Sequence, residues 1–599
     1  MCGIFGIVGI ENKKENLLNG IKKLEYRGYD SSGIAFFNND SIKIIKTVGE
    51  ISALEKLLNE KNPGFNCGIA HTRWATHGKP CNKNAHPHFS KNKNFAIVHN
   101  GIIENFKELK ARYLKNITLT SQTDSEIIVQ LIEKSFTGNV LETLQKVCNE
   151  IKGSYAFCVL YKNEPDKIYV TRKDSPLILA HTKNNSFVAS DVSAILPYTK
   201  EQFILKNMNY ATLTSKELCF YDENLKPVSY DKVIINESTV ETEKQNFTHF
   251  MLKEIYEIPT AIKQTLNAYP DISSVYNIIP KKIFKQTKHI KIIACGTAYH
   301  AGLIAKKVLE HYKIPISIDI EIASEFRYSE GIIKKNTLCI FISQSGETAD
   351  TLESIKKCKK LGAKTVSITN VKNSSITYIA DYNLYTVAGR EIAVASTKAY
   401  NSQLALLYLL FSFFSKNVKE KFYEVKTEIL NLFKNELLIE TIEKQVKALL
   451  QKYKMVNSIY CIGRGFDYET SREASLKLKE ITYTHCESYP AGELKHGTLS
   501  LIEKGVLVIC FLTQTKIADK TLNALFEVKS RDAEVLLITN KENIEKNSYD
   551  EIIYLPFKND LYLPIVSIIP IQILSYYMSL EKGINPDKPR NLAKAVTVE

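Results

Sequence analysis

The chain has little of what would place it in a membrane, on a nucleic acid or outside the cell. Its 12 cysteines are scattered along 599 residues, with no paired spacing typical of zinc sites or redox dithiols. Free thiols in a long chain indicate a reducing compartment, so we expect a cytoplasmic protein. No basic region followed by an apolar run stands at the amino terminus, and we expect no signal peptide.

A hydrophobic run suited to crossing a bilayer is also missing. Leu561–Leu580 has 20 residues without a formal charge, but it contains Pro564, Pro570, Gln572 and Ser575. A spanning helix tolerates these residues poorly. We therefore predict a buried strand or helix there and no membrane partner.

Charge is not concentrated in one part of the chain. The net charge of +14 comes from 79 basic and 65 acidic residues, and the lysines are spread along the sequence. Small anionic substrates explain this balance as well as nucleic acid does, and no nucleic-acid-binding motif is recognised. The sequence also lacks zinc-ligand spacing and a P-loop, so we expect no metal and no other cofactor.

A chain of 599 residues is too long for one hydrophobic core and predicts roughly three or four domains. The first part mixes short strand-like runs, such as Ile42–Val48 and Phe95–Val98, with loops rich in Gly, Asn and His. The polar stretch Asn236–Asn246 follows. We place the first domain boundary in this stretch.

Beyond that boundary the sequence repeats itself after about 170 residues. His289–Glu310 and Ser458–Glu480 both read as an apolar strand, a glycine turn and a helix, and a second such unit follows each, at Leu338–Leu352 and Leu507–Leu522. Both copies then reach a similar strand end, SITN in the first and LITN in the second. Strands alternating with helices predict two α/β domains with parallel sheets.

A candidate phosphate site lies in the first copy, at the strand-to-helix turn Ser343–Thr348. Hydroxyls and exposed N–H groups before a helix suit a phosphate monoester, although an isolated turn of this kind is more often only an N-cap. The second copy has Thr513–Lys516 there, without the glycine. We therefore assign the phosphate site to the first copy.

The amino terminus offers a nucleophile. Removal of Met1 would leave Cys2 with a thiol and an α-amine, and the amine can accept the thiol proton near neutral pH. Taken alone, such a cysteine is more often a small buried hydrophobe. Five further motifs follow in order: EYRGYDS from Glu25, HTRWATHG from His71, NAHPH from Asn84, VHNG from Val98 and TDSE from Thr123.

Together these motifs resemble the glutaminase domain of amidotransferases with an amino-terminal nucleophile. The resemblance implies a four-layer αββα sandwich of about 240 residues, in which Arg73 and Asp124 hold the α-carboxylate and α-amine of glutamine. It also implies that Thr76 and His77 shape the pocket. Asn100 and Gly101 would otherwise suggest a hairpin turn, but here they are implied as the oxyanion hole.

The second half resembles a pair of sugar isomerase (SIS) domains, and the motifs that carry the resemblance are CGTAYHAG, EIASEFRY, SQSGETADT, VASTKAY, LKLKEITY, AGELKHG and DKPRNLAKAVTVE. With the glutaminase motifs, they make the whole chain similar to the glucosamine-6-phosphate synthase family, of the bacterial type because no long insertion separates the halves. The implied reaction forms glucosamine 6-phosphate and glutamate from fructose 6-phosphate and glutamine. This is the first step of the hexosamine pathway, and the family suggests a homodimer.

Glu473, Lys477 and Glu480 share one helical face, which alone would indicate a solvated stripe of ion pairs. The resemblance instead makes Glu480 the base that moves a proton between C1 and C2, with Lys477 as its cationic partner. It further implies that His496 assists ring opening and that Lys594 forms a Schiff base with the open-chain ketose. The residues implied for binding the sugar phosphate are Thr297, Ser343, Gln344, Ser345, Thr348, Val394, Ser396 and Glu473.

Trp74, the single tryptophan, matches the family's gate on an ammonia channel and belongs to the glutamine site. Two positions depart from the family. Ala298 stands where serine is common, which puts one hydroxyl contact to the sugar in doubt, and Thr498 stands where proline is frequent.

We divide the chain into a glutaminase domain (1–240), a first SIS domain (241–430), a second SIS domain (431–585) and a tail that closes the sugar site (586–599). The predicted class is α+β followed by α/β. Two alternatives remain: a phosphosugar-sensing regulator, which would carry a DNA-binding domain, and an amidophosphoribosyl transferase, which would need phosphoribosyl pyrophosphate and magnesium.

Overall fold

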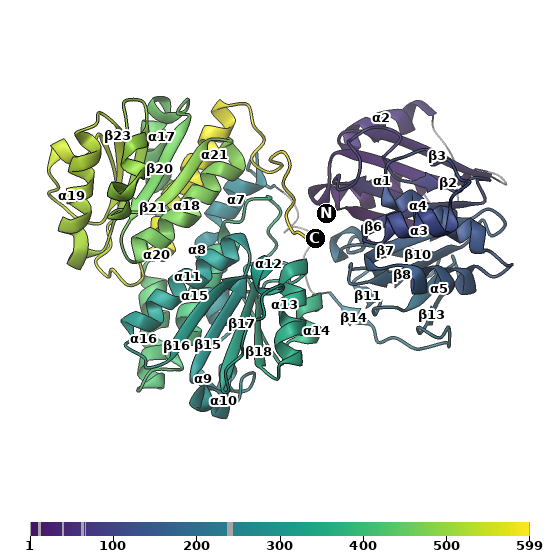
Figure 1. Cartoon of the computed structure of the whole chain (residues 1–599), viewed down its shortest axis with the longest axis horizontal. Helices are drawn as coiled ribbons and strands as arrows, with labels where there is room; N and C mark the ends of the chain where they lie inside the picture. Colours follow the sequence, from purple (N-terminus) through teal and green to yellow (C-terminus); the bar gives the residue numbers. More distant parts are fainter. Residues whose placement is uncertain are drawn as a thin grey trace. The chain divides into compact units, whose positions relative to one another are not determined.

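The computed structural model describes residues 2–9, 13–38, 41–61, 65, 67–235 and 244–597. The chain forms two units, Met1–Glu243 with Ala593–Glu599, and Lys244–Leu592 (Figure 1). The boundary predicted in Asn236–Asn246 falls mostly outside the described residues. The finer division into three domains and a tail stays a prediction.

The first unit contains two mainly antiparallel sheets. In sheet order, the eight-stranded sheet consists of β14 (Val233–Ile234), β11 (Glu201–Ile204), β9 (Ile178–His181), β10 (Asn185–Ala189), β1 (Gly3–Gly9), β4 (Cys67–Arg73), β2 (Ser31–Asn38) and β3 (Ser41–Val48). The six-stranded sheet consists of β13 (Leu218–Tyr221), β12 (Tyr210–Leu213), β8 (Ile168–Lys173), β7 (Gly153–Tyr161), β6 (Phe95–Ile103) and β5 (His88–Phe89).

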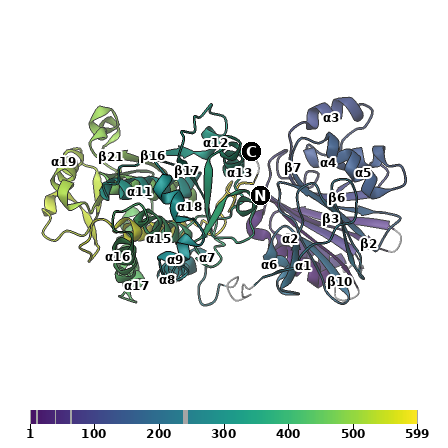
Figure 2. The same cartoon turned by 90° about the horizontal axis from the view of Figure 1, so that it is seen from below.

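Strand β1 shows why these sheets stack. Its residues are buried on both faces, and with a period of two Ile4 and Val8 pack against residues of the other sheet, while Phe5 and Ile7 pack under helices. Those helices are α1 (Lys13–Lys22), α2 (Ile51–Lys61) and α6 (Val192–Ile195). On the far side of the six-stranded sheet lie α3 (Phe106–Tyr113), α4 (Asp124–Ser135) and α5 (Val140–Glu150). The predicted αββα sandwich is confirmed (Figure 2).

The second unit contains two five-stranded parallel sheets with the same strand order, as the internal repeat predicts. The first consists of β16 (Ser317–Ile322), β15 (His289–Ala294), β17 (Thr337–Ser343), β18 (Lys364–Thr369) and β19 (Tyr382–Tyr385). The second consists of β21 (His485–Pro490), β20 (Ser458–Gly463), β22 (Leu507–Leu512), β23 (Glu534–Thr539) and β24 (Glu551–Tyr554). The predicted α/β class is confirmed.

Helices from both repeats share one core in this unit. The helix that follows the first strand of each repeat, α11 (Gly296–His311) or α18 (Phe466–Thr482), packs against its counterpart, and α15 (Lys398–Ser412) packs against α11. Leu561–Leu580 forms α20 (Pro564–Ser567) and most of α21 (Ile569–Glu581), and its residues are almost all buried. Among the described residues, no helix is long and apolar enough to span a bilayer.

Candidate active sites

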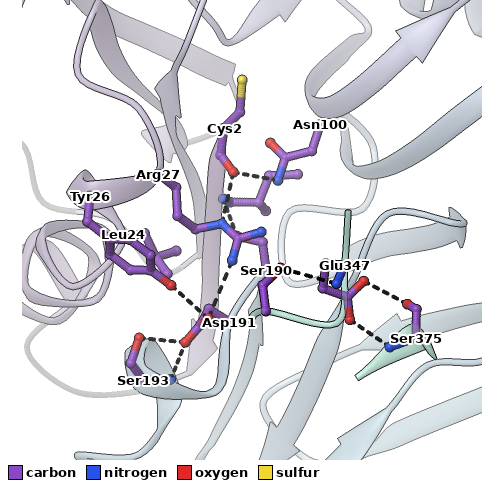
Figure 3. A network of polar contacts seen from close by, with 12 residues as sticks. Cys2, Leu24, Tyr26, Arg27, Asn100, Ser190, Asp191, Ser193, Glu347 and Ser375 are labelled. Carbon is purple, nitrogen blue, oxygen red and sulfur yellow. Dashed lines mark hydrogen bonds and ion pairs between the residues drawn. The ribbon is translucent and has the colours of Figure 1, made fainter. Parts of the chain in front are cut away.

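Cys2 stands directly before β1, and its backbone is held by Asn100 and Arg27. The Cys2 carbonyl oxygen accepts hydrogen bonds from Asn100 Nδ2 at 3.0 Å and from Arg27 Nε at 3.3 Å. Arg27 is itself held by Asp191 at 3.4 Å (Figure 3). The Cys2 Sγ atom accepts from the Trp74 N–H at 3.4 Å. Burial raises the pKa of the thiol, so a nearby base is needed to generate the thiolate.

A pocket opens beside this thiol. It is lined by five of the predicted residues together with others: Cys2, Trp74, Thr76, Asn100, Gly101, Arg27, Ser175, Pro176 and Thr597. Sequence reasoning assigned no role to Arg27, although it lies in the EYRGYDS motif that carried part of the resemblance.

Asn100 and Gly101 do not form the hairpin turn that their dipeptide suggests. Both lie inside β6, opposite Ala156 and Tyr155 of β7. Gly101 has φ of +128°, and a Cβ there would stand 2.1 Å from the Ser154 carbonyl oxygen. Only glycine fits this position, which lies at the pocket.

Arg73 and Asp124 are both almost fully buried in the first unit. Arg73 Nη2 donates to the carbonyl oxygens of His77 and, at 3.0 Å, Gly78, whereas Nη1 is buried without a hydrogen-bond partner in the part of the chain that the structure describes. Asp124 Oδ2 accepts from the Ile103 N–H at 2.9 Å. Burial lowers the pKa of Arg73, while Cys2, Asp30 and Asp124 oppose that shift.

Behind Asn100 lies a cluster of buried histidines, His71, His86, His88 and His99. The His71 Nε2 atom donates to the His99 carbonyl oxygen at 2.9 Å, and the His99 N–H donates to His86 Nδ1 at 3.2 Å. These contacts fix the tautomers, because the carbonyl can only accept and the N–H can only donate. Burial lowers the pKa of His71 to about 3 and holds those of His86 and His88 well below the ordinary value. The cluster is therefore neutral and clamps the residue before Asn100.

In the second unit, Glu473, Lys477 and Glu480 lie on α18 next to Thr297 of α11. Lys477 Nζ is 3.4 Å from Glu473 Oε1 and 2.6 Å from Glu480 Oε2, and it donates to Thr297 Oγ1 at 3.2 Å. The side chains of Glu473 and Lys477 are 0% exposed and that of Glu480 is 20% exposed. A solvated stripe is thus excluded, and Glu480 is the member of the three that solvent reaches.

The Glu473 carboxylate is also held by Thr297 Oγ1 at 3.0 Å. Burial raises the pKa of Glu473, but the combined effect of Lys477, His300 and Thr297 is larger and in the opposite direction, so the net shift is downward. For Lys477, burial lowers the pKa and the two carboxylates more than compensate, so the net shift is upward. Glu473, predicted to bind the sugar, is therefore a buried carboxylate on the side of Lys477 away from the solvent-accessible Glu480.

The loop Ser343–Thr348 joins the end of β17 to α13 (Ala349–Lys360). The Ser343 and Thr348 hydroxyls are 2.9 Å apart, and the Gly346 N–H donates to Ser343 Oγ at 3.1 Å. Gly346 has φ of +67°. The loop's carboxylate, Glu347, accepts from Ser375 N–H and Oγ at 2.8 and 2.7 Å.

The matching loop in the second repeat is filled by carboxylates of the chain. Asp467 accepts from the Thr513 N–H at 2.7 Å and Asp560 accepts from the Thr515 N–H at 2.6 Å. Burial raises the pKa of Asp467 to about 6 even though Thr513 opposes the shift. This supports the first repeat as the phosphate site.

A carboxylate also braces the segment Val394–Ser396. Glu391 accepts from Ser396 Oγ at 2.9 Å and from the N–H groups of Thr397 and Ala399 at 2.9 and 3.0 Å. The Val394 N–H donates to the Asp587 carbonyl oxygen at 3.2 Å. Since Ser396 gives its hydroxyl hydrogen to Glu391, its Oγ can only accept from a sugar hydroxyl.

Comparisons with known proteins find relatives of both halves of the chain. The glutamine amidotransferase domain family matches residues 71–197, and the SIS domain family matches 283–413 and 452–582. Proteins named glutamine–fructose-6-phosphate aminotransferase (isomerizing) are 44% identical in Clostridium acetobutylicum and 41% identical in Thermococcus kodakarensis, each over 100% of both chains. The chain belongs to this aminotransferase family.

A solved relative of this family covers the second half. The C-terminal domain of glucosamine-fructose-6-phosphate aminotransferase from Francisella tularensis is 36% identical, with a TM-score of 0.54, and covers 58% of this chain and 99% of its own. The family identity therefore extends to the pair of parallel sheets.

Two residues predicted to act on the sugar, and one position that departs from the family, lie in different parts of the chain. His496 is exposed on the 3₁₀ turn Glu493–His496 of the second unit. Lys594 is half-buried in the segment that belongs to the first unit. Ala298, at the usual serine position, is 8% exposed. The roles of His496 and Lys594, like those of the other site residues, remain predictions.

Proposed function

We infer that the chain transfers the amide nitrogen of glutamine to fructose 6-phosphate and isomerises the product to glucosamine 6-phosphate, releasing glutamate. The observation that carries this inference is the 44% identity over the full length of an enzyme named for that reaction. Like that reaction's two halves, this chain joins a match to the glutamine amidotransferase domain family with two matches to the SIS domain family. This is the first reaction of the hexosamine pathway.

We propose that Cys2 is the nucleophile of the glutaminase half. Its α-amine, exposed by removal of Met1, takes the thiol proton, and the thiolate attacks the glutamine Cδ atom. The developing oxyanion receives hydrogen bonds from Asn100 Nδ2 and the Gly101 N–H. Ammonia leaves, and water then hydrolyses the thioester to glutamate.

The buried guanidinium of Arg73 supports a site for the glutamine α-carboxylate, because Nη1 has a hydrogen to donate and no described partner. Asp124, on the adjacent helix α4, offers a carboxylate for the α-amine. Thr76, His77 and Trp74 complete the proposed glutamine site.

In the sugar half, ammonia must add to C2 of the open-chain ketose before any proton moves. We propose that His496 assists ring opening and that Lys594 forms a transient imine at C2, which ammonia displaces. Glu480 then takes a proton from C1 and returns it to C2, while the O1 hydroxyl proton passes to the nitrogen, which converts the C2 imine into the amino aldose. The partly exposed Glu480 beside the buried Lys477 suits that role.

The phosphate is proposed to bind at Ser343, Gln344, Ser345 and Thr348, with Val394, Ser396 and Thr297 near the sugar. Hydroxyls at a strand end, directly before a helix amino terminus, support an anion there. We further propose that the protein acts in the cytoplasm as a homodimer. Neither proposal requires a metal or another cofactor.

The reaction can be tested with glutamine labelled with ¹⁵N at its amide. Incubated with fructose 6-phosphate, the protein should form glucosamine 6-phosphate that carries the label, with one glutamate released per sugar. A regulator would release no glutamate. A phosphoribosyl transferase would need phosphoribosyl pyrophosphate and magnesium, so labelled product without either compound excludes that alternative.

A further inference from the structure

His300 forms a hydrogen bond to a carboxylate that solvent does not reach. Its Nδ1 atom lies 2.7 Å from Glu473 Oε2, and the side chains are 15% and 0% exposed. An ionised carboxylate can only accept, so Nδ1 carries the hydrogen and donates it. The contact joins residues 173 positions apart, on α11 and α18.

The contact continues toward the proposed base. Glu473 Oε1 is 3.4 Å from Lys477 Nζ, which is 2.6 Å from Glu480 Oε2. Opposite charges therefore alternate from Glu473 to Glu480, and His300 stands at the buried end of the row. Thr297 ties the row to α11, because its hydroxyl donates to Glu473 and accepts from Lys477.

Glu473, Lys477 and Glu480 together carry one net negative charge while His300 is neutral, and Glu391 also faces Lys477. A proton on His300 would cancel that charge. Lys477 would then be drawn more fully to Glu480, which would become a weaker base. Histidine is the side chain that ordinarily changes charge near neutral pH, so the pH profile of isomerisation tests this effect.

We propose that His300 is a positioning residue for the sugar isomerisation: it fixes Glu473, and through Lys477 it sets the position and basicity of Glu480. The inference rests on the proposed function, in which Glu480 moves the proton between C1 and C2. Loss of the His300 hydrogen bond should lower turnover, and protonation of His300 should produce an acid limb in the rate of isomerisation.

Several other charged groups surround this contact. Glu469 of α18 also faces His300, and its own pKa is raised by burial, with Arg472 and Lys307 opposing the shift. Tyr400 of α15 faces both Glu469 and Glu473, and burial keeps it neutral by raising its pKa. Lys306 and Lys307 of α11, together with Arg472 of α18, also face Glu469.

The test compares His300→Ala and His300→Asn in the full-length protein, with His311→Asn as a matched control on the same helix. The assay is conversion of fructose 6-phosphate to glucose 6-phosphate without glutamine, from about pH 5.5 to about pH 8.5. His300→Ala should lower kcat about tenfold or more with KM changed less than about threefold. His300→Asn can donate to Glu473 but cannot gain charge, so kcat near pH 8 should stay within about threefold and the acid limb should disappear.

Glutamine hydrolysis, a reaction proposed for the first unit, should be unchanged in all three variants, and parent-like urea unfolding of the second unit shows that each variant has folded. If His300→Ala does not fold, the pH profile of His300→Asn decides. Parent-like kcat and pH dependence in His300→Ala, or an unchanged acid limb in His300→Asn, would overturn the proposal. If the parent forms neither glucose 6-phosphate nor glucosamine 6-phosphate, the proposed function itself fails and this inference falls with it.

Discussion

The Asn100 side-chain amide donates a hydrogen bond of 3.0 Å to the carbonyl oxygen of Cys2. An amide nitrogen has two hydrogens, so one holds the Cys2 backbone and the other can serve an oxyanion. Asn100→Ala should therefore lower kcat for glutamine hydrolysis by about 10²- to 10³-fold with a smaller change in KM. Asn105→Ala is the matched control, since Asn105 lies just beyond the same strand and bonds to the Glu150 carbonyl. Equal rates in both variants would remove Asn100 from the oxyanion hole.

Cys2→Ala should abolish glutamine hydrolysis, because it removes the proposed nucleophile. Any tag that keeps residue 1 attached should have the same effect by blocking the α-amine. Isomerisation of fructose 6-phosphate should persist in both proteins. Cys81→Ala, which changes another partly exposed thiol of the same unit, should leave both activities intact. Residual hydrolysis in Cys2→Ala would contradict the assignment.

The buried histidines predict that the first unit loses stability in acid. His71 has a pKa of about 3 when folded, against an ordinary value of 6.5, so the unfolded chain binds more protons between these values. Its contribution is complete above pH 6.5 and is lost as the pH falls toward 3. Each such histidine costs about 1.4 kcal/mol of unfolding free energy per pH unit in that window.

His71→Gln tests this prediction, because glutamine keeps a donor for the His99 carbonyl and cannot titrate. In urea unfolding of the first unit, the free energy of unfolding should fall less steeply with decreasing pH below about pH 6.5, by the equivalent of about one bound proton. An identical slope for His71→Gln and the parent would mean that His71 is not buried in the neutral form.

Gly346→Ala should impair the phosphate loop. An added Cβ would stand 2.0 Å from Ser374 Oγ at a residue with φ of +67°, so both the loop and its neighbour must move. We expect KM for fructose 6-phosphate to rise about tenfold or more and glutamine hydrolysis to be unaffected. Gly362→Ala has a similar φ of +78° with nothing within 4 Å, and it controls for backbone strain alone. Equal KM values for fructose 6-phosphate in Gly346→Ala and Gly362→Ala would argue against a phosphate site at this loop.

Lys594→Arg keeps the positive charge but cannot form an imine, so it should eliminate glucosamine 6-phosphate formation while glutamine hydrolysis continues. Borohydride added with fructose 6-phosphate should trap a covalent adduct on Lys594 of the parent. Lys588→Arg, in the same tail, should still synthesise the product. Near-normal synthesis by Lys594→Arg would show that the tail contributes no Schiff base.

Much of the fold could be predicted from local patterns. Apolar runs such as Phe95–Val98 marked strands, and the repeat predicted two parallel sheets because each copy has the same order of strands and helices. The αββα layering came only from the resemblance. Short strands of the first unit carry no signal that tells which sheet they join, because pairing such as that of β1 with β10 links residues far apart in the sequence.

For the candidate sites too, the sequence indicates some features and not others. Motifs named Cys2, Asn100 and Lys477 as candidate site residues, but they did not indicate the contacts that hold these residues in the structure. Nothing in the spacing of His300 and Glu473 indicates that they meet, and the dipeptide at Asn100 suggested a turn where the structure has a strand. Such partners depend on tertiary packing, which brings buried polar groups together wherever the chain has a matching donor.

The two repeats satisfy the N–H groups of their matching loops in different ways, and Asp467 and Asp560 make the difference. The second repeat satisfies its loop N–H groups from within the chain, at 2.7 and 2.6 Å, and so needs no outside anion to complete its fold. In the first repeat, Glu347 is committed to Ser375, away from its own loop. We therefore expect a bound phosphosugar to stabilise the second unit against heat through the loop of the first repeat, by mass action.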